Sequence, residues 1–407
     1  MAQHRPGERN ETFDHRFVIS VPRRFSLTGG SFAKDRLRHQ DGARAELRQE
    51  VSEKATHSMT QLFRDLFGRL TRVPLKGLVI ISACIGAMGA VYAAAAGQFS
   101  STLSAQKIVD RQEGEDPFSG FRRAHAKGIC VAGVFKSNGQ LAAFSQASIF
   151  EKAETEFVGR FSIGGRNPTA PDLAAGVRSL ALDFRMDNGE RWRTAMNINP
   201  VLAVRDPASF YEQLAATAPD PETGKPSPDR IEAFFADHPE SADFREWQSR
   251  FTPSSSFATE TYHSVNAFLL KGEAGRETGV RWSLVPVAPI AEATLEGQDA
   301  LQKELFERLE EGPVQFRFLF HVAEAEDDLN DPSQAWPTDR QQIEAGIVEI
   351  VSAEPQAQGA CNGINFDPLI LPAGIEPTAD PILHARSSAY AVSLRRRALE
   401  TLLEQTK

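Results

Sequence analysis

The chain has 407 residues, enough for two average domains or for one large barrel domain with extensions. Its 54 Asp and Glu residues outnumber the 45 Lys and Arg residues, and the net charge of −9 argues against a nucleic-acid partner, which would favour a basic surface. The 27 Phe residues, against four Tyr and four Trp, supply apolar bulk without polar groups and indicate a large, dry interior.

The N-terminal part of the chain differs in composition from the remainder. Residues 1–58 are polar, rich in Arg and without apolar periodicity, which predicts a disordered extension. Residues 59–100 read as a signal anchor or signal peptide, because residues 77–97 (GLVIISACIGAMGAVYAAAAG) carry no charge and ~20 apolar residues are enough to cross a bilayer. The basic residues before this run keep the N-terminus in the cytoplasm and send the later residues across the membrane.

Three alternatives are open for this hydrophobic run. If it stays attached, we expect an inner-membrane protein whose main domain lies in the periplasm. The small residues at 90–96 also suit a signal peptidase, and cleavage there would leave a periplasmic protein. A buried core helix fits less well, because the run has a basic flank and no polar stripe.

Residues 105–407 form the main domain, in which several segments alternate in hydrophobicity with a period of two. In one of them Leu180, Leu182 and Phe184 share a face, as expected of a half-buried strand. A further strand is expected directly after Asn197. The segment that contains Leu180 is 179–186, and the other segments that read as strands are 128–135, 160–165, 264–270, 280–287, 315–322 and 346–351.

Helical stretches interrupt and follow these strands, at 209–216, 228–238, 299–312 and 386–405. Grouped strands with inserted and appended helices favour an α+β fold with an antiparallel sheet closed into a barrel. We therefore expect an antiparallel β-barrel with inserted and C-terminal helices, preceded by one N-terminal hydrophobic helix.

The three cysteines, Cys84, Cys130 and Cys361, have none of the short spacings of a zinc site. Cys84 belongs to the hydrophobic run, and the other two are far apart in the sequence. A Cys130–Cys361 disulfide would require an oxidising compartment. We expect two unrelated buried thiols instead, and no cysteine-based chemistry.

Several side chains in the main domain are suited to chemistry. On the last predicted helix, Arg386, Tyr390 and Arg397 fall on one stripe, because they are four and then seven residues apart. Arg122 and His125 directly precede a predicted strand. Each has an ordinary explanation, as a solvated arginine, a packed tyrosine or a structural histidine. The remaining candidates are Arg160, Ser162, Asn197 and Phe210.

Taken in chain order, these segments resemble the catalase superfamily, and specifically its short, single-domain catalase-related peroxidases. Residues 122–128 (RRAHAKG) resemble the distal motif of Arg, two residues, His-Ala, one residue and Gly. Residues 386–390 resemble the proximal Arg-x-x-x-Tyr motif. Between them, the segments that resemble family segments are 160–162, 197–210 (NINPVLAVRDPASF) and 366–383 (FDPLILPAGIEPTADPIL). The resemblance spans about residues 110–400 and keeps the family order.

The resemblance implies a membrane-tethered or exported peroxidase that binds haem b (iron protoporphyrin). Tyr390 is then the proximal iron ligand through its phenolate, and Arg386 keeps that phenolate ionised. On the distal side, His125 is the acid and base, Asn197 donates a hydrogen bond to the bound peroxide, and Ser162 orients the His125 ring.

The same resemblance assigns the other candidates to the cofactor. Arg122, Arg160 and Arg397 bind the haem propionates, since a planar guanidinium matches paired carboxylate oxygens. Phe210 packs on a pyrrole face of the haem.

The implied activity is reduction of hydrogen peroxide and organic hydroperoxides by an external electron donor of unknown identity, through a ferryl intermediate. Two departures from full-length catalases predict a wider entrance and favour peroxidase over true catalase activity. The chain ends soon after Tyr390, and residues 175–181 carry no acidic side chain where those enzymes have one. The long N-terminal arm of the tetrameric enzymes has no counterpart, which favours a monomer or dimer over a tetramer.

Three alternatives share the same fold. The first is true catalase activity, and the second is isomerisation of fatty-acid hydroperoxides, as in catalase-like allene oxide synthases. The third is a non-catalytic haem-binding module, which is disfavoured because simple binding needs no distal acid and base.

Overall fold

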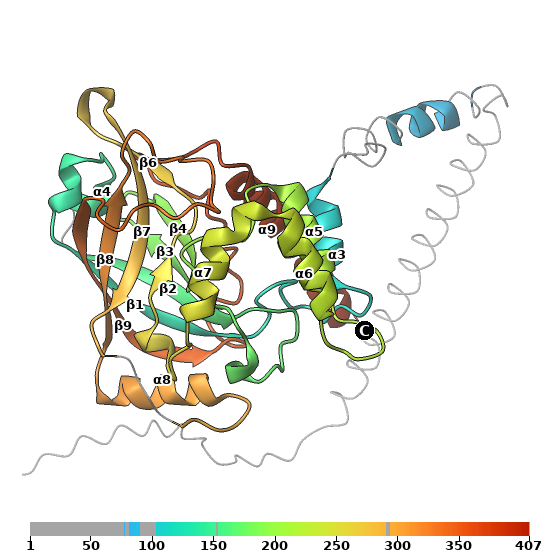
Figure 1. Ribbon diagram of the computed structural model, residues 1–407. Coiled ribbons are helices and arrows are strands. Elements are labelled where there is room, and N and C mark those ends of the chain that lie inside the picture. Colours follow the sequence, from blue (N-terminus) through green and yellow to red (C-terminus); the bar gives the residue numbers. More distant parts are fainter. Residues whose placement is uncertain (1–76, 78–80, 90–102, 152–153, 290–293, 407) are drawn as a thin grey trace, which may run out of the picture. The chain divides into compact units, whose positions relative to one another are not determined.

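The computed structural model describes residues 77, 81–89, 103–151, 154–289 and 294–406 (Figure 1). The chain divides into two units, Met1–Ala96 and Gly97–Lys407. The predicted disordered extension, 1–58, lies outside the described residues, and so does most of the predicted signal segment, 59–100. Within the hydrophobic run, residues 81–89 are described and are helical. No helix in the described ranges is both long and apolar enough to span a bilayer.

A closed antiparallel β-barrel dominates the second unit (Figure 1). Within the part of the chain that the structure describes, ten strands form one sheet, in the order β10-β6-β7-β5-β4-β3-β2-β1-β9-β8. Pairing of β7 with β8 closes a ring of eight strands, and β6 and β10 extend the sheet beyond β7. The strands are β1 Gly128–Ser137, β2 Glu154–Ile163, β3 Arg178–Arg185, β4 Arg191–Asn197, β5 Tyr262–His263, β6 Phe268–Lys271, β7 Glu277–Pro286, β8 Val314–Val322, β9 Gln342–Pro355 and β10 Ile375–Pro377.

One face of each strand fills the barrel interior. On β3, Leu180, Leu182 and Phe184 are fully buried, as their alternation predicts. Aromatic rings meet across the interior, and Trp192 of β4 stacks on Phe318 of β8 with ring centroids 5.7 Å apart. The barrel interior is therefore filled with side chains.

The second unit also contains helices outside the barrel (Figure 1). They are α3 Ala105–Glu113, α4 Ser148–Glu151, α5 Pro207–Ala216, α6 Pro228–Asp237, α7 Ala242–Arg250, α8 Ala300–Glu311 and α9 Pro381–Gln405, with short 3-10 turns η1 Gln140–Ala143, η2 Asp172–Ala174, η3 Pro239–Ser241, η4 Phe257–Thr259 and η5 Glu273–Gly275. Figure 1 shows α3, α5, α6 and α9 gathered on one side of the barrel, where α3, α5 and α9 contact one another. The start of α9 is fixed by Asp380, whose carboxylate accepts hydrogen bonds from the amides of Ile382 and Leu383.

Two predicted strands are wrong. The segment 264–270 does not form one strand, because Val265 adopts a left-handed φ of 55° and separates β5 from β6. Asn197 ends β4 instead of preceding a strand, and Pro200 removes a backbone donor from the stretch that follows. Helices α3, α4 and α7 and strands β4 and β10 were not predicted.

Cys130 of β1 and Cys361 form a disulfide, with their Cα atoms 5.3 Å apart. The expectation of two unrelated thiols is therefore wrong. Pairing of β1 with β9 brings the residues after β9 back against β1, so that cysteines 231 positions apart meet. Cys84 is unpaired and exposed.

Candidate active site

A cavity of about 250 Å³ lies outside the barrel, with walls formed by strands β2, β3 and β4 and by helices α3, α5 and α9. All nine site residues predicted from the sequence line it: Arg122, His125, Arg160, Ser162, Asn197, Phe210, Arg386, Tyr390 and Arg397. They come from both ends of the main domain. The sheet carries or flanks the distal candidates, while α9 carries Arg386, Tyr390 and Arg397.

His125 reaches the cavity from the segment just before β1. Its φ of 54° lies in the left-handed region that residues other than glycine rarely adopt, and strain of this kind concentrates at functional sites. Desolvation, followed by the charges of Arg160 and Arg386, lowers the pKa of the imidazole to about 4. The ring is therefore neutral near pH 7 and able to accept a proton.

The hydroxyl of Ser179 connects the two distal candidates. It donates to Asn197 Oδ1 at 2.5 Å and lies 3.3 Å from His125 Nδ1. Because its proton is used by Asn197, its oxygen is free to accept from His125 Nδ1–H, which leaves Nε2 with the lone pair. The amide NH2 of Asn197 is likewise left free to donate.

Ser179 was not among the residues predicted for the site. Ser162 was predicted to orient His125, but among the described residues the hydroxyl bonded to that ring is the one on Ser179. The register of β2 and β3 explains this, since Ser162 pairs directly with Ser179 and both line the cavity. The role of Ser162 stays a prediction, and correct cross-strand pairing would have revealed the second serine.

Arg386 is held by hydrogen bonds to residues that were not predicted from the sequence. It donates to the side-chain oxygen of Asn266 and, at 2.9 Å, to the carbonyl of Ala195 on β4. Asn266 in turn donates to Asp380 Oδ2 at 2.6 Å, and Asp380 caps α9. The guanidinium one turn before Tyr390 is thus fixed to the barrel on one side and to the helix start on the other.

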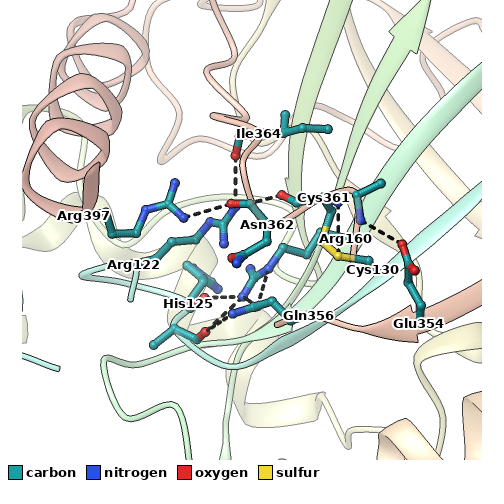
Figure 2. The surroundings of a disulfide bond; sticks show 12 residues. Arg122, His125, Cys130, Arg160, Glu354, Gln356, Cys361, Asn362, Ile364 and Arg397 are labelled. Atoms are coloured by element: carbon teal, nitrogen blue, oxygen red, sulfur yellow. Dashed lines mark hydrogen bonds between the residues drawn. A yellow bond between two sulfur atoms is a disulfide. The ribbon is translucent and has the colours of Figure 1, made fainter. Parts of the chain in front are cut away.

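Arg122, Arg160 and Arg397 form a cluster with neutral partners (Figure 2). Arg122 donates to the carbonyl of Ile364 at 2.9 Å, Arg397 to that of Asn362 at 2.9 Å, and Arg160 to that of His125 at 2.8 Å. None of the three forms an ion pair with a carboxylate of the described residues.

The arginine cluster has unused capacity for an anion. Arg122 Nη1 and Arg397 Nε are buried without a hydrogen-bond partner in the described part of the chain. Desolvation lowers the pKa of Arg160 to about 9, and the charge of Arg397 acts in the same direction. Buried cations with unsatisfied donors are unfavourable unless a ligand supplies negative charge.

The remaining lining suits a flat apolar ligand with acidic groups. Phe210, Phe366 and Ile382 contribute apolar surface, and Tyr390 enters from α9 with a phenol oxygen that an iron ion can bind. An iron porphyrin with two propionates therefore fits the residues present: apolar walls for the ring, a phenol for the metal and arginines for the acids.

Comparison with known proteins gives a consistent result. The model of the Catalase family matches residues 120–404. A catalase-related peroxidase of Synechococcus elongatus is 37% identical over 283 residues, covering 68% of this chain and 84% of that protein. A catalase-related peroxidase of Mycolicibacterium paratuberculosis is 32% identical over 289 residues, covering 68% of this chain and 89% of that protein.

Solved catalases share the fold at lower identity. A bacterial catalase has a TM-score of 0.61 and 21% identity, covering 68% of this chain and 57% of that one. Catalase A of Saccharomyces cerevisiae has a TM-score of 0.62 and 20% identity, covering 68% of this chain and 61% of that one. The chain thus spans less than two thirds of the length of these solved enzymes.

Proposed function

The chain belongs to the catalase family and is an oxidoreductase that acts on peroxide, and we propose that it is a haem b-dependent peroxidase that reduces hydrogen peroxide or organic hydroperoxides with an external electron donor. The observation that carries the proposal is one cavity lined by an imidazole, a phenol and three arginines, two of which, Arg122 and Arg397, carry a buried N–H group without a hydrogen-bond partner among the described residues. The two relatives at 37% and 32% identity are named catalase-related peroxidases, which favours peroxidase over catalase activity.

The proposed cofactor contacts follow the chemistry of the lining. Tyr390 would bind the iron through its phenol oxygen, and Arg386 lies one turn earlier on α9. Arg122, Arg160 and Arg397 would bind the propionates, and Phe210 would pack against the ring. When bound, the haem supplies the iron chemistry that cleaves the O–O bond of the peroxide.

The distal residues move a proton. Neutral His125 takes the proton from one peroxide oxygen at Nε2 and returns it to the other, so that the departing oxygen leaves as water or an alcohol. Asn197 donates its NH2 to the peroxide and holds it beside the imidazole. Ser179 keeps both groups in these orientations, because it bonds to each of them.

The proposed location is the periplasm, with the domain anchored to the inner membrane or released by cleavage. The uncharged run 77–97 and its basic flank support this, and so does the Cys130–Cys361 disulfide, because such bonds persist in oxidising compartments. Protease added to spheroplasts should digest the domain if it lies outside the cytoplasm.

Replacement of His125 tests the proposed reaction. The haem-loaded chain should consume hydrogen peroxide and an alkyl hydroperoxide only when an electron donor is present. His125→Ala should lower kcat/KM by roughly 10²- to 10⁴-fold while haem stays bound, because the proton carrier is lost. His384→Ala, which removes an exposed histidine outside the cavity, should keep the activity of the unchanged chain.

The products separate the alternatives. Oxygen release without a donor would indicate a true catalase, and an epoxide formed from a lipid hydroperoxide without a donor would indicate an isomerase. Full peroxide turnover by His125→Ala would contradict the assigned mechanism, and no turnover by the unchanged haem-bound chain would indicate a non-catalytic module.

A further inference from the structure

The segment 356–365, which we call the arginine loop, follows β9 and lies against the arginine cluster (Figure 2). It consists of turns and extended residues, with no helix or strand of its own. Its position therefore depends on contacts with the rest of the domain.

The arginine loop supplies partners to all three arginines. Arg122 donates to its carbonyls at Cys361 and Asn362, both at 3.2 Å, besides the carbonyl of Ile364. The carbonyl of Asn362 also accepts from Arg397 at 2.9 Å. At the start of the loop, the side-chain oxygen of Gln356 accepts from Arg160 Nε at 2.8 Å. The loop residues that accept hydrogen bonds from the three arginines are Gln356, Cys361, Asn362 and Ile364.

The covalent anchor of the loop is the disulfide between Cys361 and Cys130 on β1. Both cysteines are almost completely buried, at 0% and 1% exposure, beside Phe366 and Tyr390. Gly359 packs so closely on this anchor that a Cβ atom there would lie 2.7 Å from the Cβ of Cys130. The amide of Ala360 also donates to Glu354 at 2.8 Å, so the loop is fastened to the ends of β1 and β9 (Figure 2).

We propose that the Cys130–Cys361 disulfide positions Arg122 and Arg397 for binding the acidic groups of the cofactor. It does so by fixing the loop carbonyls that accept hydrogen bonds from these two arginines. This inference rests on the proposed binding of haem. When a carbonyl accepts from one N–H group of a guanidinium, the remaining N–H groups of that guanidinium are free to bind a carboxylate. Arg122 Nη1 and Arg397 Nε, which have no partner among the described residues, are such groups. Without the disulfide, the loop carbonyls lose their fixed positions, and the guanidinium groups of Arg122 and Arg397 lose their fixed orientation.

A disulfide can also act only on global stability, by restricting the unfolded chain. The two roles differ in what they change. Loss of global stability weakens every ligand of the folded cavity alike. Loss of arginine positioning weakens only ligands that carry free carboxylates.

The test is a titration of the full-length chain with iron protoporphyrin and with its dimethyl ester, whose propionates carry no charge. The unchanged chain should bind the acid form more tightly than the ester. The double variant Cys130→Ala/Cys361→Ala should bind the acid form roughly 10- to 100-fold more weakly, the equivalent of one charge-assisted hydrogen bond, with little change for the ester. Cys84→Ala removes the exposed cysteine and should match the unchanged chain.

The results decide between the roles. If the double variant keeps the full preference for the acid form, or weakens both ligands alike, the positioning role is wrong. If the double variant fails to fold, Gly359→Ala is used instead, because it keeps both cysteines and displaces the loop. A selective loss of acid-form binding in Gly359→Ala supports the positioning role, and an unchanged preference for the acid form overturns that role. If the unchanged chain binds neither porphyrin, the proposed haem function itself is wrong.

Discussion

At the scale of single residues, the hydroxyl of Ser179 decides how the two distal groups face the cavity. It donates its proton to Asn197 and lies 3.3 Å from His125 Nδ1, so we infer that its oxygen accepts from Nδ1–H and that one side chain sets an amide orientation and an imidazole tautomer together. Residues of this kind act through their neighbours without touching the substrate. They are difficult to find from a motif, because the motif contains only the neighbours.

Ser179→Ala should lower kcat/KM for peroxide by roughly tenfold, because the imidazole then populates both tautomers and the amide of Asn197 is free to flip. Ser179→Thr, which keeps the hydroxyl, should restore most of the loss. Steady-state kinetics on haem-loaded protein measures both. Ser162→Ala is the matched comparison from the facing strand and should cost less; a larger loss there would return the orienting role to Ser162.

The nine site residues could be predicted because they belong to motifs that follow one another in the order of the family, and all nine line one cavity. Their roles remain predictions. The residues that support them, Ser179, Asn266 and Gln356, could not be found, because each lies opposite its partner across strands or loops that are distant in sequence.

At the scale of elements, three neighbouring strands share a chain of polar contacts away from the cavity. His263 Nδ1 on β5 lies 2.9 Å from the hydroxyl of Ser283 on β7, which lies 3.1 Å from His321 Nε2 on β8. Desolvation, with a smaller effect of His321, lowers the pKa of His263 to about 4. Desolvation also lowers the pKa of His321.

These histidines make stability depend on pH. Unfolded histidine titrates at about pH 6.5, so between pH 6.5 and 4 the unfolded chain binds more protons than the folded one. Their contribution is present above pH 6.5 and is lost as the pH falls towards 4. His263→Gln should therefore reduce the drop in the free energy of unfolding between pH 7 and pH 5, measured with urea on the apoprotein. An equally large drop in the variant would contradict the assignment.

The strand β3 was predicted well, since its alternation follows from the side chains alone. The helix predicted at 386–405 is present as α9, which begins five residues earlier, at Pro381. The break at Val265 was missed because a left-handed backbone at a β-branched residue opposes its local preference. The Cys130–Cys361 pairing was missed because it depends on which strands are neighbours, which alternation does not specify.

At the scale of the whole molecule, the closed barrel places the site. Its interior is occupied by apolar and aromatic side chains, so the cavity forms where helices α3, α5 and α9 cover the outside of β2, β3 and β4. Closure also brings the segment before β1 beside the last helix, which unites residues from the two ends of the domain. The sequence predicted a barrel with appended helices, but hydrophobic alternation does not tell which outer face the helices cover.

The proposed function depends on the binding of haem in this cavity through Tyr390. The most direct test is a titration of the purified full-length chain with haem b, followed by absorption spectroscopy, alongside Tyr390→Phe. We expect one haem per chain with the spectrum of a high-spin, tyrosinate-ligated iron, and loss of that spectrum in Tyr390→Phe. No stoichiometric binding, or the same spectrum in both proteins, would contradict it.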